Sequence, residues 1–251
     1  MYFKEIIPYG DRGLILDFGQ QSSKSISQEV NTYYHHLKSL GLSSTNIVPS
    51  FNKIVISFYS GVDREQSLGK IQQEIGQINT STPPQDQSTW TIPVCYEDSF
   101  ALDMKRIQEL HDLSKEEIIK LHSSTTYYTY YIGFMPGFPY LGDIHPSLIT
   151  PRLESPRIQI PARSVGIAKE HTCIYPKVSP GGWNIIGQVP FDLFSLEHPR
   201  TLLFLPGDEV NFHTINQKEF ESIQRKNLSL DALIKEYSAW TPFQSPEQGL
   251  I

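Results

Sequence analysis

The stretch from Tyr130 to Leu141 reads Tyr-Tyr-Ile-Gly-Phe-Met-Pro-Gly-Phe-Pro-Tyr-Leu, which is too aromatic for an ordinary loop. Gly133 and Gly137 permit backbone angles that are closed to other residues, whereas Pro136 and Pro139 fix φ and remove two N–H donors. We therefore expect a stiff, irregular segment through which neither a helix nor a central strand continues. Its aromatic rings either pack against a core or form the wall of a cleft, and the sequence alone leaves both interpretations open.

A second segment of the same kind follows at residues 179–184, Ser-Pro-Gly-Gly-Trp-Asn. Between the two segments, Arg152 and Arg157 each follow a proline directly, and Arg163 follows Pro-Ala. A guanidinium is always protonated and presents a planar fork that suits a carboxylate or a phosphate. Surface arginines are common, so a structural role is an equal alternative for each. The place of Arg152 and Arg157 near two glycine- and aromatic-rich segments makes an anion site as plausible as that structural role.

These segments, with Ile-Tyr-Pro at residues 174–176 and Ile-Ile-Gly at residues 185–187, resemble the family that contains the B subunit of 5-oxoprolinase and the sporulation-kinase inhibitor KipI. The same family is also called allophanate hydrolase subunit 1. The resemblance extends from about Leu14 to about Phe212, and several long motifs in one order are far more specific than a single glycine-rich match. It implies an α+β fold in which a small N-terminal α/β sandwich precedes a cyclophilin-like β-barrel.

The composition is that of a soluble globular chain of 251 residues, with 39% hydrophobic and 19% charged residues. The net charge is −6, and the basic residues are scattered, which argues against nucleic acid as a partner. The sequence shows neither a signal peptide nor an apolar run long enough for a membrane span, so we expect a cytoplasmic protein. Cys95 and Cys173 are then expected to be free, buried thiols.

The N-terminal part alternates strand and helix patterns in the order β-β-α-β-β-α, which predicts an α/β sandwich. Residues 79–88 are polar, proline-rich and almost uncharged, as linkers usually are. We therefore predict an N-terminal domain at residues 1–82, a barrel domain at 89–218 and a C-terminal helical tail at 219–251.

The barrel domain should begin with a strand at residues 90–96 and two short helices at 101–111 and 115–123. Ser114 and Glu117 form the capping-box pattern that starts the second helix. From Thr125 onward, short strand patterns separated by Pro and Gly are typical of a barrel or sandwich. We predict strands at residues 126–132, 158–160, 164–168, 172–175, 183–189, 202–205 and 209–214, and then one or two helices within 219–240, interrupted at 227–229.

Two further side chains are candidates for chemistry. His122 ends a helix just before the aromatic segment and could act as an acid or base near neutral pH, although a helix C-terminus also favours a histidine for electrostatic reasons. Ser164 lies in no Gly-x-Ser-x-Gly elbow, and we reject it as a nucleophile. The sequence contains no Walker-type phosphate loop and no Cys/His spacing of a zinc site. It therefore carries no self-sufficient ATPase or metal motif.

The resemblance implies a non-autonomous part of an ATP-driven complex that cleaves 5-oxoproline to glutamate, with the C and A subunits as partners and ATP bound through the complex. An aromatic, arginine-lined cleft would be one wall of a shared site for this small-molecule substrate. Two residues, His122 and Arg157, are then candidates for catalysis. The candidates for substrate binding are Gly133, Phe134, Pro136, Gly137, Phe138, Tyr140, Arg152, Pro161, Arg163, Ser164, His171, Tyr175, Pro180, Gly181, Gly182 and Trp183.

The chain departs from the family pattern at several of these positions. Relatives read Pro-Ala-Gly-Ser where this chain has Arg163 as the third residue, and Gly-Arg-Thr-Pro where it has Gln188 as the second. The run from Lys169 to Cys173, with His171 at its centre, replaces a Gly-Gly-x-Gln-Thr-Gly pattern. We hypothesise that the cleft keeps one cation but holds it in another place, at Arg163.

The family also contains inhibitors that bind a sensor histidine kinase, and sequence separates this function poorly from that of an enzyme component. A prolyl isomerase would follow only from analogy of fold, which does not establish function. The expected partner distinguishes the two main alternatives: a protein resembling allophanate hydrolase subunit 2 for the enzyme, and a sensor kinase for the inhibitor.

Overall fold

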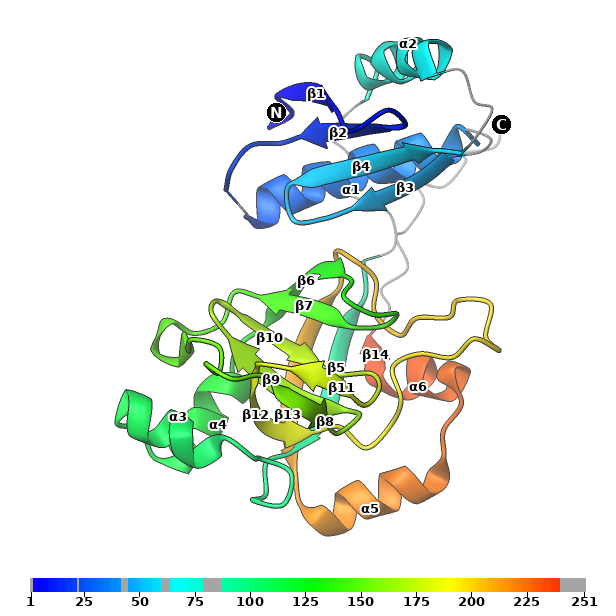
Figure 1. Ribbon diagram of the computed structural model, residues 1–251. Helices are drawn as coiled ribbons and strands as arrows, with labels where there is room; N and C mark the ends of the chain where they lie inside the picture. Colours follow the sequence, from blue (N-terminus) through cyan, green and yellow to red (C-terminus); the bar gives the residue numbers. More distant parts are fainter. Residues whose placement is uncertain (1, 22, 42–44, 60–63, 79–86, 240–251) are drawn as a thin grey trace, which may run out of the picture. The chain divides into compact units, whose positions relative to one another are not determined.

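The computed structural model describes residues 2–21, 23–41, 45–59, 64–78 and 87–239 (Figure 1). The chain divides into two compact units, Met1–Asp86 and Gln87–Ile251, and the second includes the helical region predicted as a tail. Most of the predicted linker, residues 79–86, lies outside the described residues. None of the described helices is long and apolar enough to cross a membrane.

The first unit combines an antiparallel sheet with two helices. Its described elements are β1 (Glu5–Pro8), β2 (Gly13–Asp17), α1 (Lys24–Ser39), β3 (Thr45–Pro49), β4 (Lys53–Phe58) and α2 (Arg64–Ile75). The strands lie in the order β1-β2-β4-β3. The predicted β-β-α-β-β-α sandwich is therefore confirmed.

The sheet of this unit buries one face against its two helices. In β4, Ile54, Ile56 and Phe58 alternate with partly exposed residues and are at most 4% exposed, as expected for a strand with one covered face. Tyr33 of α1 and Ile71 of α2 belong to the same hydrophobic cluster, so both helices cover that face. The apolar side chains of the unit thus form a core of their own.

The second unit is built around a closed barrel. Its described elements are β5 (Thr89–Cys95), α3 (Met104–His111), α4 (Lys115–Ser123), β6 (Tyr127–Ile132), β7 (Pro139–Gly142), η1 (Pro146–Leu148), β8 (Arg157–Ile160), β9 (Ser164–Ala168), β10 (His171–Ile174), β11 (Ser179–Gly181), β12 (Asn184–Gln188), β13 (Glu209–Ile215), α5 (Gln217–Lys226), α6 (Leu230–Tyr237) and β14 (Ser238–Ala239). The predicted α+β fold with a C-terminal barrel is confirmed.

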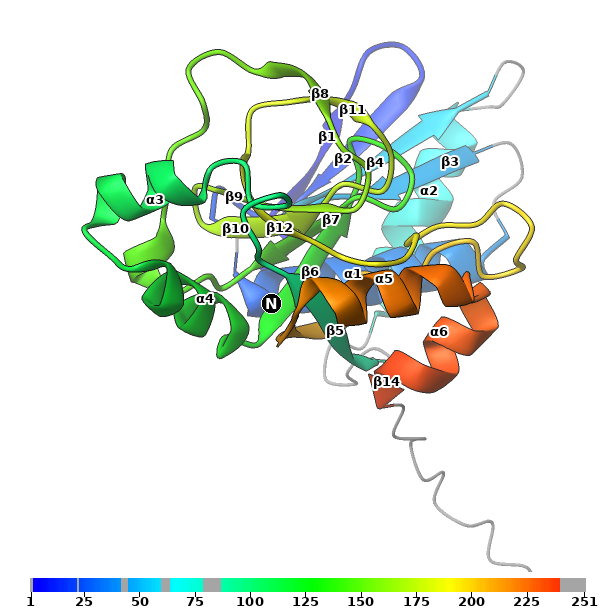
Figure 2. The ribbon, with the colours of Figure 1, turned by 90° about the horizontal axis from the view of Figure 1, so that it is seen from below.

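The strands follow the order β12-β9-β10-β7-β6-β13-β5, and pairing of Gln188 in β12 with Cys95 in β5 closes the ring. β5 and β13 run parallel, and β14 adds a short strand to β5. The pair α3 and α4 lies on one side of the barrel, and the pair α5 and α6 lies on another (Figures 1 and 2). β8 and β11 form a separate two-stranded ribbon.

The aromatic stretch is irregular only at residues 133–138, so that prediction was partly wrong. Residues 130–141 form a hairpin whose second strand, β7, is a central strand between β6 and β10. Pro139 is the first residue of β7, a position where a strand tolerates proline, and Gly137 lies in the turn with a φ of 82°. The prolines and glycines therefore shape the tip of the hairpin without interrupting its pairing.

Other boundaries agree closely with the sequence patterns. The capping box of α4 is present, because Glu117 accepts from the backbone N–H of Ser114 and Ser114 accepts from that of Glu117. The C-terminal region forms two helices separated around Asn227, as expected. The predicted strand at 202–205 is absent: Leu202 makes only an isolated bridge to Phe194.

Candidate functional site

The barrel sheet carries a second apolar cluster on its outer face. Leu141 of β7, Ile174 of β10 and Ile186 of β12 point into the barrel core, whereas their neighbours in sequence belong to a separate cluster. Because side chains alternate along a strand, that cluster lies on the opposite face of the sheet. We call its four large rings, Phe138, Tyr140, Tyr175 and Trp183, the aromatic patch.

The rings of the aromatic patch come from both glycine- and aromatic-rich segments and from the residue after β10. The centroid of Phe138 lies 5.0 Å from that of Tyr140, 5.1 Å from that of Tyr175 and 5.8 Å from that of Trp183. Their planes are steeply inclined, the geometry that aromatic quadrupoles favour. The structure therefore brings together the two segments from which the sequence predicted a site.

The aromatic patch is a packed surface rather than an open cleft. Phe138, Tyr175 and Trp183 are at most 5% exposed, and Tyr140 is half-buried. The Tyr175 hydroxyl packs against the backbone of Gly181, where any β-carbon would lie only 2.3 Å from it. The rings thus support one another and leave Tyr140 as the most accessible of the four.

A cation lies above one end of the aromatic patch. The guanidinium carbon of Arg152, an exposed residue, is 5.8 Å from the centroid of the Trp183 ring, within the range of a cation–π contact. Burial raises the pKa of the Tyr140 hydroxyl, and the charge of Arg152 partly offsets this increase. Arg152 is therefore close enough to Tyr140 for its field to reach that hydroxyl.

A half-buried imidazole lies beside the same tyrosine. The ring centroid of His171 is 6.4 Å from that of Tyr140 and 6.1 Å from that of Tyr130. Burial lowers the pKa of His171 below its usual value of 6.5, so the ring is neutral at pH 7. A guanidinium, flat aromatic faces and a neutral imidazole together suit a small planar anion that also carries polar groups.

Arg157 does not face the aromatic patch. Its Nη1 and Nη2 donate to the two carboxylate oxygens of Asp103 at 2.8 and 2.6 Å, and Asp103 also accepts from the backbone N–H of Ile185 at 2.6 Å. Asp103 is 5% exposed and precedes α3. The fork that we expected to bind a ligand thus joins β8 to α3 and β12, which gives Arg157 a structural role.

His122 lies inside the barrel, not at a catalytic surface. Its side chain is fully buried and stacks on Phe212 with centroids 4.7 Å apart. Thr172 donates its hydroxyl proton to the carbonyl of Gly166, so His122 Nε2 donates to Thr172 Oγ1 at 3.0 Å. His122 Nδ1 then accepts from the Tyr96 hydroxyl at 2.7 Å. Burial lowers the pKa of His122 to about 3, which makes the ring a neutral structural group.

Arg163 does not supply the replacement cation that we hypothesised. With its side-chain oxygen turned toward Arg163, Gln224 of α5 accepts from both terminal guanidinium nitrogens at 2.9 and 3.0 Å. The Arg163 Nε lies 4.0 Å from a carboxylate oxygen of Asp192. The guanidinium therefore holds α5 against the barrel. Ser164, the next residue, is 2% exposed within β9.

Most of the remaining predicted residues are glycines and prolines that shape the chain near the aromatic patch. Phe134 is the exception: it is 60% exposed and has a φ of 68°, which is unfavourable for a bulky residue. Its ring nevertheless makes an edge contact with Phe138. The others lie in the β6–β7 turn or along the β8–β11 ribbon and its flanks: Gly133, Pro136, Gly137, Pro161, Pro180, Gly181 and Gly182.

Sequence reasoning missed Asp103. An aspartate just before a helix normally caps that helix, but the Asp103 side chain makes no capping bond, because its oxygens bind Arg157 and Ile185. Asp103 and Arg157 are separated by 54 positions. No local pattern predicts such a pair. The ion pair of Arg157 with a buried aspartate therefore becomes visible only in the folded structure.

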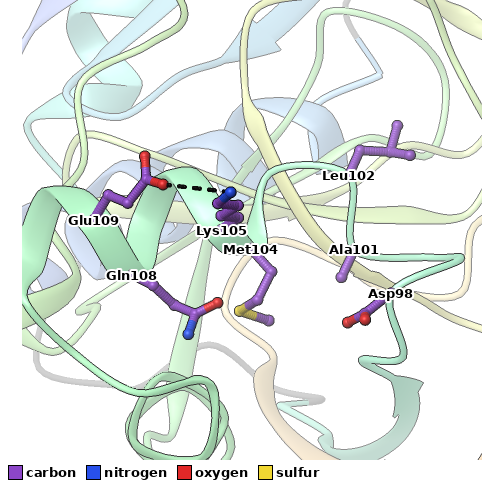
Figure 3. Close-up of a pocket in the computed structure, with 7 residues that line it drawn as sticks. All are labelled: Asp98, Ala101, Leu102, Met104, Lys105, Gln108 and Glu109. Carbon is purple, nitrogen blue, oxygen red and sulfur yellow. Dashed lines mark ion pairs between the residues drawn. The ribbon is translucent and has the colours of Figure 1, made fainter.

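The structure also contains a cavity beside α3. A cavity of 510 Å³ is lined by Asp98, Ala101, Leu102, Met104, Lys105, Gln108 and Glu109 (Figure 3). Lys105 and Glu109 form an ion pair across successive turns of α3 at 3.9 Å. None of the predicted site residues lines this cavity. Among the described residues, no group of three or more His, Cys, Asp or Glu side chains could hold a metal ion.

Comparison with known proteins decides the family. Residues 4–204 match the family described as "Carboxyltransferase domain, subdomain C and D". The chain belongs to this family. It is 30% identical over 243 residues to the B subunit of 5-oxoprolinase from Bacillus subtilis, covering 89% of this chain and 98% of that one. The protein of the same name from Escherichia coli O157:H7 is 41% identical over 128 residues, 51% of this chain and 58% of that one. The resemblance recognised in the sequence motifs is therefore confirmed.

Solved structures show the same fold within longer chains. The crystal structure of TTHA0988 matches 82% of this chain with a TM-score of 0.71 and 28% identity, yet the match spans only 40% of that chain. Kluyveromyces lactis urea carboxylase matches 88% of this chain with a TM-score of 0.71, and the match spans 22% of the urea carboxylase chain. The sequence identity is 18%, so this match shows the fold alone.

Proposed function

We propose that this chain is the B subunit of an ATP-dependent 5-oxoprolinase complex that cleaves 5-oxoproline to glutamate. The relative that it matches over nearly its whole length is named as the B subunit of 5-oxoprolinase. That name marks the relative as one member of a multi-subunit assembly. The partners that we propose are the C subunit, which resembles allophanate hydrolase subunit 2, and the A subunit.

The geometry favours ATP binding by the partner subunits. Phosphate sites commonly use the free N–H groups at the start of a helix. In this chain, the first turns of α4 and α5 are capped by their own carboxylates, Glu117 and Glu219, which would repel a phosphate. Arg157 and Arg163 are committed to internal partners. We therefore propose that ATP binds to the partner subunits rather than to this chain.

The observation that carries the proposal for this chain is Arg152 above the aromatic patch. 5-Oxoproline has one carboxylate and one flat cyclic amide. The guanidinium would bind the carboxylate through charge-assisted hydrogen bonds, while the ring lies against Tyr140, the most accessible ring of the aromatic patch. The partner subunits would cover this half-exposed surface and exclude water, which strengthens the ion pair. The chain thus binds and orients the substrate for chemistry that the complex completes.

Substitution of Arg152 tests this assignment. In the reconstituted complex, Arg152→Gln should lower kcat/KM for 5-oxoproline by about 10- to 100-fold, the effect of losing a charge-assisted hydrogen bond of about 1.5 to 3 kcal/mol. Its melting temperature should stay close to that of the wild type, because the side chain is exposed. Arg225→Gln, at an exposed position in α5, is the matched control and should retain full activity. Unchanged kcat/KM in Arg152→Gln would remove the aromatic patch from the reaction.

A further inference from the structure

The backbone that carries Arg152 is held on both sides by the sequence neighbours of Trp183. Nδ2 of Asn184, the first residue of β12, donates to the carbonyl of Pro151 at 2.9 Å. The backbone N–H of the residue after Arg152 donates to the carbonyl of Gly182 at 2.8 Å. Both anchors flank Trp183, so the cation and the ring over which it lies are tied to the same piece of backbone.

The side chain of Asn184 is completely buried, and its amide makes three hydrogen bonds. Besides the bond to Pro151, Nδ2 donates to the carbonyl of Ile167 at 3.1 Å, and Oδ1 accepts from Nε of Arg106 at 3.0 Å. A guanidinium can only donate and a carbonyl can only accept, so Arg106 fixes which end of the amide faces Pro151. A residue of α3 therefore sets the direction of the donor that holds the Arg152 segment.

Arg152 depends on this backbone because no ion pair holds its side chain. Within the part of the chain that the structure describes, its guanidinium pairs with no carboxylate, in contrast to that of Arg157, which binds Asp103. A long, exposed side chain loses conformational entropy when one contact with a ring holds it in place. A shift of its backbone would thus move the charge away from Trp183, and a small displacement of a positioned group weakens its effect strongly.

We propose that Asn184 is a positioning residue that holds Arg152 over the aromatic patch for the anionic group of the bound ligand. This inference rests on the proposed function and deepens it, because it assigns the placement of the ligand-binding cation to a buried side chain. Asn184 does not contact the ligand: its effect passes through the backbone of Pro151 to Arg152. A residue that acts only through another has no effect once that other is removed, so the two substitutions should be non-additive.

Asn184→Asp in the reconstituted complex tests this role. The substitution keeps the shape of the side chain and its bond with Arg106, but a carboxylate cannot donate to Pro151. We expect it to weaken 5-oxoproline binding about tenfold, and to change binding by less than about twofold in a chain that already carries Arg152→Gln. In the isolated chain, the Nε–Hε NMR signal of Arg152, which the ring current of Trp183 displaces, should move toward the position of an exposed arginine.

Gln188→Glu is the matched control. Gln188 lies in the same strand, and its Nε2 donates to the carbonyl of Ala162 at 2.7 Å. This variant therefore removes the same kind of bond from a segment that does not carry Arg152, and both the Arg152 signal and 5-oxoproline binding should stay unchanged. Asn184→Ala removes the amide without introducing a buried charge, and it should have the same effects as Asn184→Asp.

These outcomes separate the inference from the proposed function. Normal binding of 5-oxoproline by Arg152→Gln contradicts the proposed function, whatever happens to the Arg152 signal in the other variants. If Arg152→Gln weakens binding but the two Asn184 variants leave the Arg152 signal or the binding unchanged, the role of Asn184 alone is overturned. Equal weakening by Asn184→Asp with and without Arg152→Gln also overturns it, and so does an equal loss in Gln188→Glu, which would indicate a general disturbance of β12.

Discussion

Replacement of Asp103 by alanine should lower the free energy of unfolding by about 3 to 5 kcal/mol, the cost of leaving one partner of a buried ion pair alone. Asp103 neutralises Arg157, whose side chain is only 30% exposed, and accepts the buried backbone N–H of Ile185. Without the carboxylate, the guanidinium has no counter-charge and the N–H has no acceptor. Both losses destabilise the contact between the start of α3 and the strands β8 and β12.

Chemical denaturation of the purified chain would measure this loss. Asp98→Ala is the matched control. Asp98 also forms an ion pair, with Lys115, but the Asp98 side chain is 93% exposed. An exposed pair contributes little, so that variant should lose less than about 1 kcal/mol. Arg157→Lys should destabilise as well, because lysine cannot bind both carboxylate oxygens. A stable Asp103→Ala variant with impaired substrate binding would return Arg157 to the functional site.

Acid should destabilise the barrel through His122. The pKa of this group is about 3 in the folded chain and about 6.5 when the chain is unfolded. Between these values the unfolded state binds the additional proton, so stability is fully present above pH 6.5 and falls as the pH is lowered toward 3. At about 1.4 kcal/mol per pH unit, the titration of His122 should lower the free energy of unfolding by about 2 to 3 kcal/mol between pH 7 and pH 4.5.

The difference between variants isolates this contribution from that of other groups. His122→Gln should be less stable than the wild type at pH 7 but should lose about 2 to 3 kcal/mol less on acidification to pH 4.5. Phe212→Leu removes the ring that stacks on His122 and keeps the imidazole buried. It should lower stability at both pH values and retain the dependence on pH. Parallel pH profiles for the wild type and His122→Gln would contradict the buried, neutral state of His122.

Local patterns were sufficient for most of the fold. The alternation of Ile54, Ile56 and Phe58, and the capping pair Ser114 and Glu117, depend on neighbours within a few residues. Such patterns fix strands and helix starts because the backbone responds to them directly. The two aromatic-rich segments were also recognised in this way, and the structure brings them together.

Long-range partners explain what the sequence did not predict. Arg157 and His122 have the chemistry of functional residues, but Asp103 and Tyr96 engage them inside the fold. Arg163 likewise turns toward Gln224, in a helix far along the chain. The prolines of the aromatic stretch also led us to expect no central strand there. β7 nevertheless forms, because Pro139 is its first residue, where strand pairing tolerates proline. Arg152 differs because its guanidinium lies over Trp183, which belongs to the predicted site itself.

We propose that this chain acts as one component of a 5-oxoprolinase complex and has no activity on its own. The most direct test is glutamate release from 5-oxoproline in the presence of ATP, measured for the chain alone, for the C and A subunits without it, and for all three together. We expect turnover only when all three are present. Turnover by the isolated chain, or full activity of the partners in its absence, would contradict the account.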